Sequence, residues 1–300
     1  MIKISDVLKE TRPDLVLVHG DTTTTLATSL GCFYQGIRVG HVEAGLRTGN
    51  LHSPFPEEFN RQVVSRIADL HFAPTETCRL NLIKEGVAAD KIFVTGNTVI
   101  DALFWTLSKI EKDSALRNAI IKDLDKKLQF KWQSERFVLV TGHRRENFGE
   151  GFQEICHALS DLSEKYPKLE FVYPVHLNPN VHEPVFRILG KHKNISLIDP
   201  LDYLSFSMLL GSCFFVLTDS GGIQEEAPSL GKPVLLMRDT TERPEGVLAG
   251  TTELVGANRE QIVRSASRLI EDEETFQRMA NSVNPYGSGN SVESILRGIH

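Results

Sequence analysis

Short apolar runs alternate with helix-forming segments along almost the whole of this 300-residue chain. In the first third, the runs that we expect to form strands are Leu15–Val18, Ile37–His41, Leu70–Ala73 and Lys91–Thr95. Such alternation is typical of a parallel sheet with helices on both faces. We therefore predict an α/β protein whose ligand-binding groups lie at the carboxyl ends of the strands.

A second series of the same kind starts near residue 137. Its expected strands are Phe137–Val140, Phe171–Val175, Ile195–Ile198, Phe214–Thr218 and Val234–Met237. A long helical stretch, Val99–Leu128, separates the two series, so we expect two α/β domains that face a cleft. The first would span residues 1–100, with a last helix at about 288–300 packing back on it. The second, with the linker helix, would span residues 101–287.

The composition excludes several classes of protein. A net charge of −6 gives no electrostatic reason to expect nucleic acid or a membrane surface as partner. No apolar run approaches the length of a membrane span, and the N-terminus lacks a signal segment. The cysteines are far apart in apolar surroundings: Cys32, Cys78, Cys156 and Cys213. They suggest buried free thiols, so we expect a cytoplasmic protein.

A polar turn of Ser220, Gly221 and Gly222 lies between an apolar run and a helix-forming segment. Such a turn leaves the first N–H groups of the helix unpaired, which suits a phosphate group. Glu226 could then reach a ribose hydroxyl, and Arg243 adds positive charge downstream. The alternative is an ordinary strand–helix–strand crossover in which the glycines serve only the turn.

Positive side chains gather after two other expected strands of the second domain. His143, Arg144 and Arg145 follow the first strand, and His176 follows the next. Arginine forks match phosphate oxygens in bidentate geometry. The alternatives are surface salt bridges for the arginines and a structural role for the histidines.

The first domain contributes acids at its strand ends and loops: Asp21, Glu43, Glu57 and Glu58. Clustered carboxylates repel each other unless they transfer protons or bind a cation, and such clustering raises the pKa of at least one. A metal site is the competing interpretation, but no histidine or cysteine stands at ligand spacing. His19 and His41 each precede a carboxylate by two residues and could hydrogen-bond to it.

Eight motifs together carry a family resemblance: Val18–Thr25, Gly40–Thr48, Pro54–Glu58, Phe93–Asp101, Thr141–Glu146, Tyr173–Asn180, Thr218–Pro228 and Arg238–Glu245. With them the chain closely resembles the non-hydrolysing bacterial UDP-N-acetylglucosamine 2-epimerases. The resemblance implies two Rossmann-like, doubly wound domains arranged as in GT-B glycosyltransferases, with the sugar nucleotide in the cleft. It also implies a cytosolic homodimer that serves enterobacterial common antigen or another surface polysaccharide.

The family's reaction is reversible C2 epimerisation of UDP-N-acetylglucosamine to UDP-N-acetylmannosamine. It proceeds by elimination of UDP through 2-acetamidoglucal, without cofactor or metal. By match to the family, the catalytic groups are Asp21, Glu43, Glu57 and His143. Arg144, Arg145 and the turn at Ser220 could bind the departing diphosphate, while Glu226 and Arg243 fall on further UDP contacts. His176 falls on a contact linked to the family's allosteric substrate site.

One departure from the family concerns the N-terminus. Family members open with a strand and a Gly-Thr-Arg-Pro-Glu loop that this sequence lacks before its first helix. We therefore expect a truncated first domain, an exposed edge at Leu15–Val18 and poor turnover by the 300-residue chain. The alternatives are a retaining GT-B glycosyltransferase, which needs an acceptor, and a catalytically impaired UDP-binding remnant.

Overall fold

The computed structural model describes residues 2–299, without the side chains of Ile2 and Arg145. The chain divides into two compact units. Unit 1 comprises residues 1–101 and 285–300, and unit 2 comprises residues 102–284. No helix of the described part is long and apolar enough to cross a membrane.

Unit 1 is built on a parallel sheet in which sequential strands are neighbours, in the order β1-β2-β3-β4. The strands are β1 (Leu15–His19), β2 (Arg38–Val42), β3 (Leu70–Ala73) and β4 (Ile92–Val94). The helical elements are α1 (Ile2–Thr11), α2 (Thr23–Phe33), α3 (Glu57–Ile67), α4 (Glu76–Lys84), the 3₁₀ turn η1 (Ala89–Lys91) and α14 (Ser291–Ile299). All four predicted strands of this half are confirmed.

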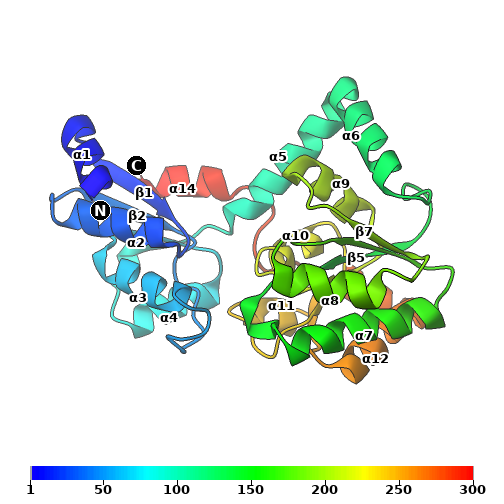
Figure 1. Ribbon diagram of the computed structural model, residues 1–300. Coiled ribbons are helices and arrows are strands. Elements are labelled where there is room, and N and C mark those ends of the chain that lie inside the picture. Colours follow the sequence, from blue (N-terminus) through cyan, green and yellow to red (C-terminus); the bar gives the residue numbers. More distant parts are fainter. Residues whose placement is uncertain (1, 300) are drawn as a thin grey trace. The chain divides into compact units, whose positions relative to one another are not determined.

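Successive side chains of a strand point to opposite faces of the sheet, and helices cover both faces of unit 1. On one face, Val39 packs with Cys32 of α2 and Val64 of α3. On the other, Val42 packs with Ile295 of α14, the helix at the red end of the chain (Figure 1). The C-terminal helix thus completes the core of the N-terminal half of the chain.

Strand β1 lies at the edge of this sheet. It pairs with β2 alone among the described strands, in register from Leu15–Arg38 to His19–Val42. Leu17 on this strand is 48% exposed. The prediction of an exposed edge at Leu15–Val18 is confirmed.

Unit 2 contains a six-stranded parallel sheet in the order β10-β9-β8-β5-β6-β7. The strands are β5 (Phe137–Thr141), β6 (Glu170–Pro174), β7 (Ile195–Ile198), β8 (Val216–Thr218), β9 (Val234–Leu236) and β10 (Thr252–Leu254). The order runs outward in both directions from β5 and β8. This reversal makes the β5–β8 pair a topological switch point, where loops diverge and ligands bind in open α/β sheets.

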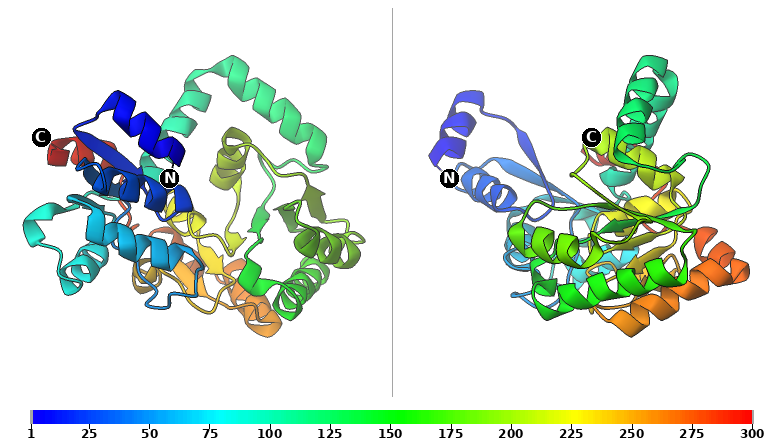
Figure 2. Two further views of the ribbon diagram at one scale, coloured as in Figure 1. Left: turned by 60° about the vertical axis from the view of Figure 1, so that its left-hand side comes forward. Right: turned by 45° about the vertical axis from the view of Figure 1, so that its right-hand side comes forward.

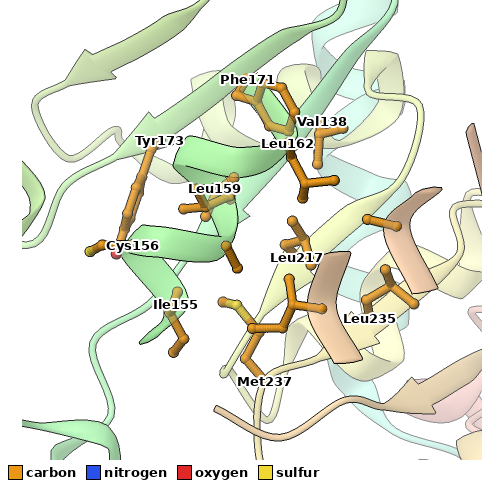
Figure 3. Close-up of a cluster of buried hydrophobic side chains, with 14 of the residues drawn as sticks. Val138, Ile155, Cys156, Leu159, Leu162, Phe171, Tyr173, Leu217, Leu235 and Met237 are labelled. Carbon is orange, nitrogen blue, oxygen red and sulfur yellow. The ribbon is translucent and has the colours of Figure 1, made fainter. Parts of the chain in front are cut away.

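Helices cover both faces of the unit 2 sheet (Figure 2). Figure 3 shows one face, where Ile155 and Leu159 of α7 pack over Val138 and Leu217. On the other face, Leu209 of α9 packs near the strands in a second cluster. The helical elements are α5 (Thr98–Lys112), α6 (Ser114–Lys127), η2 (Arg145–Asn147), α7 (Glu150–Lys165), α8 (Pro179–Leu189), α9 (Tyr203–Ser212), α10 (Ile223–Ser229), α11 (Pro244–Leu248), α12 (Arg259–Glu271) and α13 (Glu273–Ala280).

The predicted long helix Val99–Leu128 is wrong in one respect, because it is two helices, α5 and α6. Asp113 separates them. Its backbone is extended and its carboxylate accepts the N–H of Leu116 at 2.9 Å, so it acts as the N-cap of α6. All four cysteines are buried and unpaired, as the sequence predicted.

Candidate active site

The loops after β5 and β8 meet at the switch point of unit 2. The buried carboxylate of Asp219 accepts the backbone N–H groups of His143 and Arg144 through Oδ2, each at 2.9 Å. At the last residues of β5 and β8, the hydroxyls of Thr141 and Thr218 lie 2.6 Å apart. These contacts hold the loop of His143 and Arg144 against the Ser220 turn. Asp219 was not among the predicted site residues, although it directly precedes that turn.

His143 and His176 lie side by side, as expected for two histidines at neighbouring strand ends. Their rings stack with centroids 5.5 Å apart and planes inclined by 15°. Burial lowers the pKa of His143, the nearby Asp219 carboxylate opposes this, and Arg144 and His176 lower it further. His176 Nδ1 accepts the N–H of Asn178 at 3.1 Å, which orients the ring. His143 is therefore poised to be neutral while it faces a buried anion.

The Ser220 turn differs in detail from the prediction. The N–H of Ser220 donates to the hydroxyl of Thr218 at 2.9 Å, so this group is already satisfied. The N–H groups of Gly221 and Gly222 have no hydrogen-bond acceptor within the part of the chain that the structure describes. The N–H groups of Ile223 and Gln224 likewise have no acceptor among the described residues, so a row of four donors is available to an anion here.

Two buried arginines downstream of this turn share one carboxylate, that of Glu242. Arg243 donates from Nη1 to Glu242 at 2.6 Å and from Nε to Glu225. Arg238 donates to the other oxygen of Glu242 at 2.9 Å and to Glu146 at 2.6 Å. Burial opposes the charge on Glu242, but Arg243 and Arg238 hold its pKa at about 2. Glu242 is thus an anion that fixes both guanidinium groups.

Gly221 leaves space that the guanidinium groups of Arg243 and Arg144 occupy. A Cβ atom at this position would lie 2.9 Å from Nη1 of Arg243, 3.0 Å from Glu242 and 3.3 Å from Nη2 of Arg144. The predicted cations are therefore gathered against the turn. Arg145 follows in the same loop, but its side chain lies outside the described residues.

Glu226 is 6% exposed and stands one turn into α10. The hydroxyl of Tyr203, the first residue of α9, donates to Oε1 of Glu226 at 2.6 Å. Burial raises the pKa of Glu226, and the Tyr203 hydrogen bond lowers it in part. Glu226 was a predicted site residue, whereas Tyr203 was not.

In unit 1, Asp21 follows the carboxyl end of β1 and forms an ion pair with Arg61 of α3. The side chain of Asn60 donates to the backbone carbonyl of Asp21 at 2.8 Å. Arg61 also binds Glu58 at 3.1 Å, and Glu58 accepts the N–H groups that begin the loop after Arg47. Glu58 is fully buried, and its hydrogen bonds to these N–H groups hold the loop in place. Arg61 was missed because its partner is 40 residues away in sequence.

Glu43 lies beside the turn that carries Asp21. Its backbone is left-handed, with a φ of 67°, and its Oε2 is 3.1 Å from where a Cβ of Gly20 would be. Asn97, after β4, donates to Oε1 of Glu43 at 3.3 Å. The structure thus brings the predicted residues Asp21 and Glu43, at the ends of β1 and β2, close to the end of β4. Glu57 is half-buried at the start of α3, and its side chain has no hydrogen bond or ion pair to any described residue.

The histidines on these strands do not pair as expected. His19 lies 3.8 Å from Glu43 on the neighbouring strand rather than against Asp21. His41 is buried and contacts the carbonyl oxygen of Gly20 at 2.8 Å instead of a carboxylate. Burial lowers the pKa of His41 to about 3, against the effect of that hydrogen bond. His41 is a neutral donor that fixes the Gly20 turn.

The model of the UDP-N-acetylglucosamine 2-epimerase family matches residues 1–300. The chain belongs to this family. The UDP-N-acetylglucosamine 2-epimerase of Escherichia coli (strain K12) is 56% identical over 296 residues, which are 99% of this chain and 78% of that protein. The family resemblance drawn from the eight motifs is confirmed.

Solved structures of 2-epimerases share the fold. The enzyme from Neisseria meningitidis, bound to UDP-GlcNAc, has a TM-score of 0.94 and 50% identity, covering 99% of this chain and 79% of that one. The enzyme from Methanocaldococcus jannaschii, in complex with UDP-GlcNAc and UDP, has a TM-score of 0.83 and 36% identity, covering 99% and 78%. The predicted class, two Rossmann-like α/β domains of GT-B type, is that of these epimerases.

Proposed function

We propose that this protein catalyses the reversible epimerisation of UDP-N-acetylglucosamine at C2, giving UDP-N-acetylmannosamine. Membership of the 2-epimerase family supports the reaction. The observation that best supports a substrate with a diphosphate is the presence of free backbone N–H groups at Gly221 and Gly222. Arg243 and Arg144 lie beside them. Backbone donors and guanidinium forks at a switch point suit a nucleoside diphosphate.

The chemistry divides into an elimination and an addition. A base removes the C2 proton while the C1–O bond breaks, so UDP leaves as an anion and a C1–C2 double bond forms in 2-acetamidoglucal. UDP then adds back to C1, and an acid delivers a proton to the opposite face of C2. Electrons balance without an oxidant, so no cofactor is needed. The cations of the Ser220 turn stabilise the charge on the departing diphosphate.

The proposed proton carriers are Asp21, Glu43 and Glu57, with His143 assisting. Asp21 is oriented by Arg61 and by the bond from Asn60. Glu43 is oriented by Asn97. Inversion requires proton transfer on two faces, and carboxylates on separate elements can supply a base and an acid.

Arg145 would add to the diphosphate site, and His176 would serve regulation by substrate. We propose a cytoplasmic homodimer that supplies surface polysaccharide synthesis, such as that of enterobacterial common antigen.

Proton NMR in heavy water tests the proposal directly. UDP-N-acetylglucosamine incubated with the protein alone should incorporate deuterium at C2 and yield the manno epimer. The 300-residue chain should do so more slowly than a chain extended by the family's Gly-Thr-Arg-Pro-Glu segment. A glycosyltransferase would leave C2 unlabelled and require an acceptor. UDP binding by calorimetry without C2 exchange would instead indicate a nucleotide-binding protein and would contradict the epimerase.

A further inference from the structure

Asp219 is a fully buried carboxylate whose two oxygens have different surroundings. Oδ2 accepts the backbone N–H groups of His143 and Arg144, each at 2.9 Å, and the side-chain N–H of Asn147 at 3.4 Å. Oδ1 is buried and has no hydrogen-bond partner among the described residues. A buried acceptor without a donor is costly, and more so when it belongs to a charged group. Holding the loop explains Oδ2 but leaves Oδ1 without a role.

The ring of His143 faces this second oxygen. Its Nδ1 lies 3.8 Å from Oδ1 of Asp219, which is an ion-pair distance but too long for a hydrogen bond. Such contacts are often long without substrate and shorten in the complex. The histidine side chain is 45% exposed and that of Asp219 is fully buried, so the histidine can meet a ligand and the carboxylate cannot. The ring also stacks on His176, which restricts its rotation.

Three described side chains act on the charge of His143. Burial lowers the pKa of His143, Asp219 raises it, and Arg144 and His176 lower it further. The ring is therefore neutral at pH 7 while the site is empty. A diphosphate anion bound beside the ring would act in the same direction as Asp219 and favour the imidazolium.

We propose that Asp219 is a positioning residue that holds the Nδ1 proton of His143 and leaves Nε2 for the diphosphate of the substrate. In the free protein, the carboxylate fixes the tautomer of the neutral ring, because the partner of one ring nitrogen decides which nitrogen carries the proton. In the complex, Nε2 takes a proton from water, and Asp219 stabilises the imidazolium that donates to the diphosphate. This inference rests on the proposed function, because it takes UDP as the group that His143 meets.

Asp219→Asn tests this with little change to the loop, because the amide oxygen can keep the three bonds now made by Oδ2. Its NH₂ group then replaces Oδ1 and donates to Nδ1 of His143, which moves the proton of the neutral ring to Nε2. Nitrogen-15 NMR should show Nδ1 protonated in the unmodified protein and Nε2 protonated in the variant. The signals of His143 are assigned by their absence from a His143→Ala protein. By calorimetry, Asp219→Asn should weaken UDP binding roughly 10-fold or more, the weight of a hydrogen bond to a charged group.

A double-mutant cycle separates positioning from a structural role. In the His143→Ala protein, Asp219→Asn should weaken UDP binding by less than about threefold, because the carboxylate acts through the ring. Tyr173→Phe is the matched control, since this buried phenol supports the same loop by donating to the carbonyl of Gly142 at 3.0 Å. It should leave the tautomer of His143 unchanged.

Three results would overturn the inference. One is a proton on Nε2 of neutral His143 in the unmodified protein, which is read without ligand and decides even where a variant does not fold. Another is UDP affinity that Asp219→Asn leaves unchanged or increases. The third is the same loss of affinity with and without the His143 ring. No UDP binding and no C2 exchange in the unmodified protein would instead overturn the proposed function, and with it the ligand of His143.

Discussion

Gly221 shows at the scale of one residue why the turn after β8 requires glycine. The guanidinium groups of Arg243 and Arg144 already fill the space that a side chain here would enter. Gly221→Val should therefore displace both and lower the affinity for UDP at least about 10-fold, the effect of losing one charged hydrogen bond. Isothermal calorimetry measures this, and circular dichroism should show an intact fold.

Gly211 in α9 provides the control for Gly221, since no atom lies within 4 Å of its would-be Cβ. Gly211→Ala should leave UDP affinity unchanged and stabilise the helix by about 0.5–1 kcal/mol. Equal affinities in Gly221→Val and the unmodified protein would show that the arginines do not bind the nucleotide from this position.

His41 and His71 make unit 1 sensitive to acid. Burial lowers their pKa values to about 3 and about 4, below the ordinary 6.5. Between pH 6.5 and 4 the unfolded chain binds these protons and the folded chain does not. The free energy of unfolding should therefore fall as the pH falls, by up to about 1.4 kcal/mol per pH unit for each histidine. Urea unfolding from pH 7 to pH 5 measures the slope, and His41→Asn should reduce it. Equal slopes in both proteins would contradict this role of His41.

The sequence could not reveal those site residues whose role depends on a partner far away in the chain. Ser220 and His143 follow strands directly, so their position was readable from the pattern. Asp219 acts by binding a loop 76 residues away, and Arg61 by binding Asp21 across 40 residues. Spacing predicts which strand end carries a group, but only packing determines which buried charges pair.

At the scale of elements, the length and polarity of a segment decided what could be predicted. Continuous apolar runs such as Phe137–Val140 mark buried strands, and all nine predicted strands are present. Strand β10 was missed because Thr252–Leu254 is short and contains a glutamate. The break at Asp113 was missed because helix formers flank it on both sides. A capping aspartate is clear only once its carboxylate is seen on the N–H of Leu116.

The exposed edge of β1 has a consequence for the 300-residue chain. One side of its backbone pairs with no described strand, and Leu17 on this strand is an exposed apolar side chain. Leu17→Lys should raise the concentration at which these chains associate roughly 10-fold or more, since burying a leucine is worth about 1.5–3 kcal/mol. Light scattering over a dilution series measures this. Leu248→Lys is the control, because Leu248 is 84% exposed on α11 and on no strand edge. The same shift in both variants would exclude pairing through β1.

At the scale of the whole molecule, each unit has its own core and carries a different part of the proposed chemistry. Unit 2 gathers cations and free N–H groups around the Ser220 turn. Unit 1 gathers carboxylates at the ends of its strands, with Asp21 and Glu43 on adjacent loops. Each set is fixed by ion pairs within its own unit: Arg61 holds Asp21 in unit 1, and Glu242 holds Arg243 in unit 2. Nucleotide affinity and proton transfer should therefore respond to different substitutions.

Asp21→Asn and Glu57→Gln test this division. Each should slow deuterium uptake at C2 of UDP-N-acetylglucosamine by about 10²–10⁴-fold, the usual contribution of a general acid or base. UDP affinity should change little, because these side chains belong to unit 1 and the proposed diphosphate site to unit 2. Glu76→Gln is the control, since Glu76 is an exposed unit 1 carboxylate that pairs only with Arg79 among the described residues. Normal C2 exchange in either variant would show that this carboxylate does not transfer the proton. An equal loss of UDP affinity would show that the carboxylate also contributes to nucleotide binding.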